Sequence, residues 1–383
     1  MIYLDYNATT PLDPRVFEAM LPIFRDRFGN AASRHHAFGK EAAAAVETAR
    51  EQAAAVIGAD PEEIYWTSGA TESNNLALKG VAVAPAYVPK GNHIVTVATE
   101  HRAVLDPCEF LENRGFKVTY LGVDREGMLD LEKLEKAITE KTILVSIMHG
   151  NNETGVLHPI DQIGAICRKK GALFHTDATQ TYGKALIDVD SDCIDLLSAS
   201  AHKFCGPKGA GILYLRKRNP RVRCEAILHG GGHERGLRSG TLNVPAVAGF
   251  GAAADLCRKE MPSEQPRFRA LRDRLEKGLR SALDGVELNG HPTQRLAHTT
   301  NLSFAGIDAE DLMKALPDVA VSSSSACTSA LLQPSYVLGA LGCPEERIKG
   351  SIRFSLGRFT TEAEIDSAVA AVTAAVTKVR ADG

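Results

Sequence analysis

Residues 64–75 read IYWTSGATESNN, a short apolar run that passes through small and hydroxyl-bearing residues into a helical pattern. This order predicts a β-strand followed at once by a helix. The same alternation recurs from about residue 63 to residue 215, and it predicts an α/β fold with a parallel sheet covered by helices on both faces. Ligands of such sheets bind beyond the carboxyl ends of the strands. The seven predicted strands are Ile64–Thr67, His93–Ala98, Lys117–Leu121, Thr142–Met148, Leu173–Thr176, Ile194–Ser198 and Gly211–Leu215.

A different pattern begins after about residue 245. Two long helical stretches are separated there by Pro262 and Pro266. The expected elements are helices at Ala246–Glu260, Arg267–Leu283 and Thr361–Val379 and strands at Thr300–Phe304 and Ser351–Ser355. Because 383 residues exceed the ~250–300 that a single core usually serves, we expect two domains. The predicted divisions are a large domain at 14–245, a smaller α+β domain at 246–383, and an N-terminal segment at 1–13 that packs with the small domain.

Composition and charge exclude several classes of protein. The chain carries a formal net charge of -3 and is 44% hydrophobic, which gives no reason to expect a nucleic acid or a membrane surface as a partner. No apolar run approaches the ~18 residues of a membrane span, and the first residues do not resemble a signal peptide, so a cytoplasmic enzyme is expected. The 8 cysteines form no C-x-x-C pair and no ladder with zinc spacing, so no metal site is predicted.

Polar residues follow two of the predicted strands. The small residues at 68–75 would let backbone amides approach an anion, and Thr71 adds a hydroxyl donor; an ordinary helix N-cap explains the same residues equally well. Further along, Asp177 either caps a turn or faces a pyridine nitrogen and keeps it protonated, which makes the ring an electron sink. In the second interpretation Gln180 hydrogen-bonds the phenolic oxygen of the same ring.

Lys203 follows the next predicted strand, beside small hydroxyl residues and ahead of a Gly-Pro turn. Lysine is almost never buried without a partner, so this one either reaches the surface or is used covalently. A lysine that forms a Schiff base needs a depressed pKa, which burial near other cationic groups provides. A phosphate anchor, a strand-end acid and a strand-end lysine, in that order, predict an enzyme in which Lys203 holds pyridoxal 5'-phosphate (PLP) as a Schiff base.

Longer motifs now identify a family. The chain resembles the cysteine desulfurases of the iron–sulfur-cluster and nitrogen-fixation type, in the class V aminotransferase-like superfamily of fold-type I PLP enzymes. The resemblance extends from residue 3 to residue 361. Its most specific stretches are 67–75, 99–101, 151–155, 177–180, 202–203, 230–241 and 322–329. It implies a large domain with a seven-stranded, mostly parallel sheet, a smaller α+β domain and a homodimer.

The resemblance also implies a role for each matching residue. Lys203 would carry PLP, Asp177 would face its pyridine nitrogen, His101 would stack on the ring and assist proton transfers, and Gln180 would meet the phenolic oxygen. The phosphate would be held by Ala70, Thr71, Ser200 and His202, and by Thr241 from the neighbouring subunit. The substrate, L-cysteine, would be held by Asn30, Arg353 and Asn152, of which Asn152 also contacts the cofactor and Arg353 grips the substrate carboxylate.

Cys327 decides which reaction the family resemblance implies. It lies in a run of small polar residues, at about 321–332, that has no apolar periodicity and is typical of a loop. Such a setting favours a reactive thiol over a packed one. The hypothesis is that Lys203 removes the Cα proton of L-cysteine, the Cys327 thiolate attacks the substrate sulfur, and L-alanine leaves. The sulfur then stays on Cys327 as a persulfide for a protein acceptor, either an iron–sulfur scaffold or a thiolation protein.

Two alternatives stay open at this stage. A selenocysteine lyase or another class V PLP enzyme would share the cofactor residues but would not need a cysteine in a small-residue loop. A non-catalytic sulfur carrier or scaffold on the same fold would be expected to lack Lys203 or Asp177, and both residues are present.

Overall fold

The computed structural model describes residues 1–323 and 334–382, and its centre is a seven-stranded sheet. The strands lie in the order β2 (Ile64–Thr67), β8 (Gly211–Leu215), β7 (Leu196–Ser200), β6 (Leu173–Asp177), β5 (Thr142–Ser146), β3 (His93–Val97) and β4 (Lys117–Leu121). Only β8 runs antiparallel to its neighbours, so the sheet is mostly parallel, as expected. All seven predicted strands are present; β7 begins and ends two residues later than predicted.

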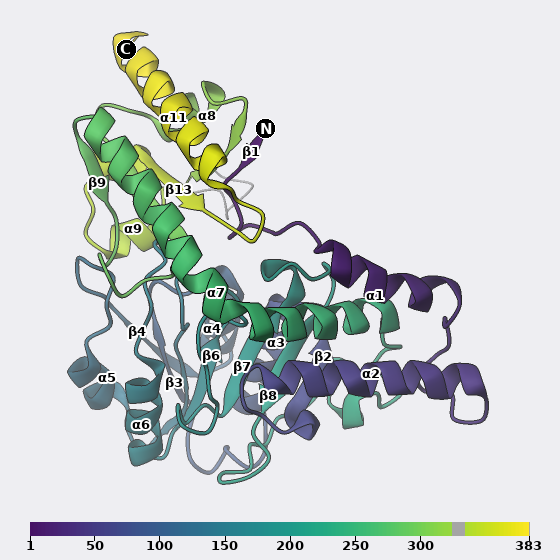
Figure 1. Cartoon of the computed structure of the whole chain (residues 1–383). Coiled ribbons are helices and arrows are strands. Elements are labelled where there is room, and N and C mark those ends of the chain that lie inside the picture. Colours follow the sequence, from purple (N-terminus) through teal and green to yellow (C-terminus); the bar gives the residue numbers. More distant parts are fainter. Residues whose placement is uncertain (324–333, 383) are drawn as a thin grey trace.

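Helices cover both faces of this sheet (Figure 1). Alternate residues of β2 show why: Trp66 joins the core under one set of helices, and Tyr65 joins the core under the other. The first set is α1 (Pro14–Arg25), α2 (Ala37–Ala55), α5 (Leu131–Ala137), α6 (Ile160–Lys170) and the beginning of α7 (Val244–Ala282). The second set is α3 (Ala70–Ala82) and α4 (Arg102–Glu112). Among the described residues, short 3-10 helices lie at Pro61–Glu63, Ala201–Lys203 and Glu234–Gly236.

The C-terminal part of the chain has its own sheet and its own core. Four antiparallel strands lie in the order β12 (Ser322–Ser323), β13 (Ser351–Ser355), β10 (Thr299–Phe304) and β9 (Val286–Leu288). The helices beside them are α8 (Ala309–Lys314), α9 (Tyr336–Ala340), α10 (Glu345–Lys349) and α11 (Glu362–Asp382). The chain's first strand, β1 (Ile2–Tyr3), pairs with β11 (Val319–Ala320), and Leu4 is buried in the same core. The N-terminus therefore returns to the C-terminal half of the molecule (Figure 1).

Helix α7 corrects one expectation. The two helices predicted on either side of Pro262 and Pro266 are one helix of 39 residues. A proline removes one backbone donor and kinks a helix without always ending it, and Figure 1 shows α7 changing direction along its length. Its first part packs in the core of the large sheet, and its last part packs in the C-terminal core. Because α7 packs in both cores, it does not separate the two predicted domains, and the domain boundary near residue 245 stays a prediction.

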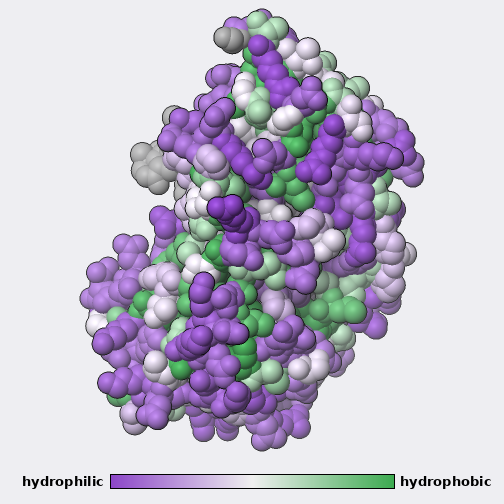
Figure 2. Space-filling model, turned by 90° about the vertical axis from the view of Figure 1, so that its left-hand side faces the viewer, coloured by the Kyte–Doolittle hydropathy of each residue, from purple (hydrophilic) through white to green (hydrophobic). Residues whose placement is uncertain are grey.

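The surface over α5 and α6 is mostly hydrophilic (Figure 2). Lys169 of α6 pairs there with Glu135 of α5 at 2.8 Å. Within residues 1–323 and 334–382, no helix is both long enough and apolar enough to cross a bilayer.

Candidate active site

A cavity of about 550 Å³ opens at the carboxyl ends of the parallel strands, where the fold class places a ligand. It collects residues that lie far apart in the sequence. Ten of the predicted site residues line it: Ala70, Thr71, His101, Asn152, Asp177, Gln180, Ser200, His202, Lys203 and Arg353. Cys327 lies outside the described residues.

One end of the cavity suits an anion. Helix α3 starts there, and its N-cap, Gly69, provides no side-chain hydrogen bond, so the ordinary N-cap considered above is not what the segment forms. The first backbone N–H groups of α3 and the positive end of its dipole face the cavity. Strand β8 packs closely against this turn. A Cβ on Gly211 would lie only 2.5 Å from the Cα of Gly69, so the close contact requires a glycine at position 211.

A carboxylate beside this helix start is neutralised. Glu72 accepts hydrogen bonds from the backbone N–H of Ser68 at 2.8 Å and from Nε of Arg238 at 2.7 Å. Burial opposes ionisation, but these hydrogen bonds hold the pKa of Glu72 below its usual value. Arg238 therefore offsets a negative charge that would otherwise repel a phosphate.

The other end of the cavity suits a protonated ring nitrogen. Asp177 ends β6 and is buried. Its Oδ2 accepts a hydrogen bond from Nδ2 of Asn74 at 2.6 Å, and its Oδ1 accepts one from the backbone N–H of Thr179 at 2.9 Å. These two bonds hold the carboxylate in the cavity wall. The bond to Thr179 also caps the turn, as in the interpretation that gave Asp177 only a structural role.

Burial shifts two neighbours of Asp177, Glu100 and His101, toward their neutral forms. Burial, and then the nearby charge of Asp177, raise the pKa of Glu100 well above its usual value, which favours its neutral form. Burial also lowers the pKa of His101, against the opposing charge of Asp177. His101 accepts a hydrogen bond from the backbone N–H of Ala103 at Nδ1, so its proton is on Nε2. His101 thus presents a neutral N–H donor to the cavity.

Lys203 and Gln180 meet at one backbone carbonyl. Lys203 Nζ donates to the oxygens of Asn7 and Ala8, at 2.6 Å and 2.8 Å, and Gln180 Nε2 donates to the oxygen of Asn7 at 3.0 Å. The Asn7 side chain donates in turn to the Asn152 carbonyl at 3.1 Å. The same side chain donates to Oγ1 of Thr299 in β10 at 3.0 Å, so Asn7 links the cofactor residues to the C-terminal half. The sequence predicted that segment 1–13 packs with the small domain but gave Asn7 no role at the site, because only the fold brings this segment to the cavity.

Arg353, which lies in β13, also lines the cavity. Its Nη2 donates to Asp5 at 2.7 Å, and its Nη1 donates to the Asn152 carbonyl at 3.0 Å. Its buried Nε has no hydrogen-bond partner among the described residues. The guanidinium is thus held in place by two of its five N–H groups, and the others stay available for a carboxylate.

Asn30 and Thr241 do not line this cavity. They lie together in a separate hollow of about 310 Å³ that also includes Phe24 and Phe28. Thr241 was expected to act on a neighbouring subunit, so its position here agrees with that role without testing it. The expected contact of Asn30 with the substrate stays a prediction.

The residues present fit PLP. An uncapped helix start lies at one end of the cavity, a buried carboxylate lies at the other, and Lys203 lies between them. The Oε1 of Gln180 is buried and has no partner among the described residues, as expected of a group that awaits a polar ligand. Within the same residues, no cluster of metal-binding side chains occurs.

The chain belongs to the aminotransferase class-V family, whose model matches residues 2–368, and this confirms the predicted family and PLP as its cofactor. A relative from Anaeromyxobacter sp. (strain Fw109-5), named cysteine desulfurase IscS, is 58% identical over 379 residues, which cover 99% of this chain and 93% of the relative. A solved NifS-like protein superposes with a TM-score of 0.91 at 38% identity, covering 98% of this chain and 99% of its own. The structure described as SspA in complex with cysteine superposes with a TM-score of 0.83 at 37% identity, covering 94% of this chain and 100% of that one.

Proposed function

We propose that this chain is a cysteine desulfurase, which converts L-cysteine to L-alanine and holds the sulfur on Cys327 as a persulfide. The observation that carries the proposal is a single cavity in which Lys203, Asp177 and Arg353 surround one space. Relatives that are 53–58% identical over nearly the whole chain carry the name cysteine desulfurase IscS and support it. Neither the lyase alternative nor the scaffold alternative is favoured by these relatives.

Each residue has a task that follows from its position. When bound, PLP supplies an electron sink for the charge left on the substrate Cα after proton loss. Asp177 keeps the pyridine nitrogen protonated, and Arg353 binds the substrate carboxylate. Lys203 Nζ takes the Cα proton, and His101, which lines the same cavity, donates or accepts protons through Nε2. The uncapped start of α3 holds the phosphate.

The sulfur step uses Cys327, which lies outside the described residues. Its thiolate attacks the sulfur of L-cysteine, a sulfur–sulfur bond forms, and the carbon–sulfur bond breaks. The electron pair of the broken bond stays on the substrate carbon, which gains a proton and becomes the methyl group of L-alanine. One L-cysteine and one thiol therefore give one L-alanine and one persulfide, with no external oxidant.

Two variants test the assignment. Lys203→Ala should lose the visible absorbance of the lysine-linked cofactor, and retention of that absorbance would contradict the role of Lys203. Cys327→Ser should bind PLP normally but lower alanine formation by about 100-fold or more, because no nucleophile remains for the sulfur. Cys193→Ser is the matched control, since this partly exposed thiol lies outside the cavity. Single-turnover labelling should place the persulfide on Cys327; its absence there would favour a lyase.

The proposal includes a homodimer that acts in the cytoplasm and passes its sulfur to a protein acceptor. Large apolar side chains are exposed around the hollow that contains Thr241, and Phe24 and Phe28 are 58% and 68% exposed. An apolar patch of this kind is typical of a protein interface. The native mass should equal two chains, and Phe24→Lys with Phe28→Lys should lower it to one. A single-chain mass for the unmodified protein would contradict this part.

A further inference from the structure

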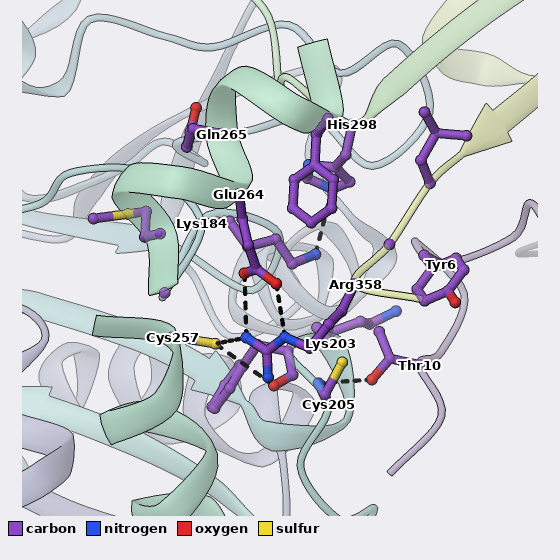
Figure 3. Close-up of a pocket in the computed structure, with 16 residues that line it drawn as sticks. Tyr6, Thr10, Lys184, Lys203, Cys205, Cys257, Glu264, Gln265, His298 and Arg358 are labelled. Atoms are coloured by element: carbon purple, nitrogen blue, oxygen red, sulfur yellow. Dashed lines mark hydrogen bonds and ion pairs between the residues drawn. The ribbon is translucent and has the colours of Figure 1, made fainter. Parts of the chain in front are cut away.

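A second, smaller cavity lies behind Lys203, between the large sheet and the C-terminal half (Figure 3). Its volume is about 30 Å³, enough for ordered water and too small for a substrate. Lys203 forms part of its wall, and so does Lys184, which lies in the turn that follows β6 and contains Gln180. The two lysines therefore line the same small cavity.

Lys184 is held from the other half of the molecule. Its Nζ lies 3.3 Å from Nε2 of His298, the residue that precedes β10. An ammonium can only donate, so His298 accepts through Nε2. Burial, and then the charge of Lys184, lower the pKa of His298 well below its usual value, which keeps the ring neutral and able to accept.

No carboxylate neutralises Lys184 within the described parts of the chain: none of their ion pairs includes it. The nearest acidic wall residue, Glu264, is engaged by Arg358 at 2.7 Å, and Arg358 also pairs with Asp13 at 2.9 Å. The titratable and charged groups that line the cavity with Lys184 are Tyr6, Lys203, Cys205, Cys257, Glu264, His298 and Arg358. Lys184 therefore places a positive charge that no carboxylate compensates in the cavity wall that it shares with Lys203.

We propose that Lys184 is a positioning residue for Lys203: held by His298, its ammonium places a second positive charge behind the Lys203 amine and favours the neutral, nucleophilic form of that amine. Two like charges that share a poorly hydrated space each disfavour the charged form of the other. This inference rests on the proposed role of Lys203 as the cofactor lysine. A lysine that forms a Schiff base needs a cationic neighbour. The inference gives this role to Lys184, which lies in none of the sequence motifs.

The electrostatics of Lys184 itself agree with this arrangement. Burial, and then the charge of Lys203, lower the pKa of Lys184 to about 8. The same charge contributes at the phosphate end: burial, then Lys203, and also Lys184 lower the pKa of His202 to about 4. The field of Lys184 thus reaches both residues of the His202-Lys203 motif.

The test measures how Lys203 titrates without relying on catalysis. The full-length protein is freed of PLP with hydroxylamine, and its amines are labelled with acetic anhydride over a series of pH values. Mass spectrometry then gives the labelling midpoint of each lysine. In Lys184→Met and in Lys184→Gln the Lys203 midpoint should rise by at least about one pH unit, the shift expected for unit charges about 12 Å apart at an effective dielectric constant of about 20. At neutral pH the rate at which PLP reloads should then fall by about 10-fold, because the neutral amine is about tenfold scarcer.

Two controls separate charge from packing. Lys184→Arg keeps the charge and should leave the Lys203 midpoint unchanged. Lys90→Met removes another partly buried lysine, which donates to the Gly171 carbonyl at the opposite edge of the sheet, and should also leave it unchanged. Folded neutral variants with an unshifted Lys203 midpoint would overturn the inference.

The unmodified protein supplies a further measurement if the neutral variants do not fold. Lys184 should then label with a midpoint near 8, and an ordinary lysine midpoint would equally overturn the inference. Failure of the proposed function would look different. In that case Lys203→Ala would retain the cofactor absorbance while the labelling midpoints still reported the charge of Lys184.

Discussion

Replacing Arg353 by lysine should raise the KM for L-cysteine and leave kcat nearly unchanged. The arginine already uses one donor on Asp5 and one on the Asn152 carbonyl, and its Nε remains without a partner among the described residues. The planar guanidinium can therefore still offer two donors to a carboxylate. A lysine has three N–H donors, and if two of them replace the contacts to Asp5 and Asn152, only one is left for the substrate.

The magnitude follows from that count. One charge-assisted hydrogen bond contributes about 1.5–3 kcal/mol, so losing one should lower kcat/KM by roughly 10- to 150-fold. The substrate carboxylate does not change during the reaction, so it is bound equally before and in the transition state, and the loss should appear in KM.

The assay is alanine formation over a range of L-cysteine concentrations, with the melting temperature measured beside it. Arg347→Lys is the matched control, because Arg347 is an arginine of the same half that binds Asn289 and Glu287 outside the cavity. A change in KM below about threefold in a folded Arg353→Lys protein would refute the reasoning, and so would a loss confined to kcat.

Two further predictions concern stability. Glu234 accepts hydrogen bonds from both Nη atoms of Arg50 at 2.9 Å and from the backbone N–H of Trp66 at 2.8 Å, so Glu234→Gln should destabilise the protein by about 3–5 kcal/mol and lower Tm by roughly 6–20 °C. Adding Arg50→Met should recover part of this loss, and a Tm drop below about 2 °C would contradict the role of the pair. Burial raises the pKa of Glu153 from 4.5 to about 7, against the hydrogen bond from Ser335, so the folded state binds a proton that the unfolded state releases between these values. Stability should therefore fall as pH rises through this window, and Glu153→Gln should flatten that part of the Tm–pH curve; an unchanged slope would contradict it.

Much of this protein is determined by local sequence. The strands of the large sheet were predictable to within two residues, because six of the seven are buried along their whole length and are rich in apolar residues. The candidate chemistry was equally local: Asp177 and Lys203 each follow such a strand, and the carboxyl ends of parallel strands meet at one edge. Even Arg353 was identifiable, although only through the resemblance of a longer motif.

The tertiary structure alone decided what surrounds these residues. Pro262 and Pro266 kink α7 without ending it, because packing in two cores outweighs the lost backbone hydrogen bonds. The sequence assigned no role to Asn7, Glu100 or Lys184, since their roles depend on partners more than 100 residues away or on burial. Charge and burial act through space, whereas periodicity and motifs act along the chain. The sequence by itself therefore determined which residues form the site, and only the fold decided the electrostatic setting in which they act.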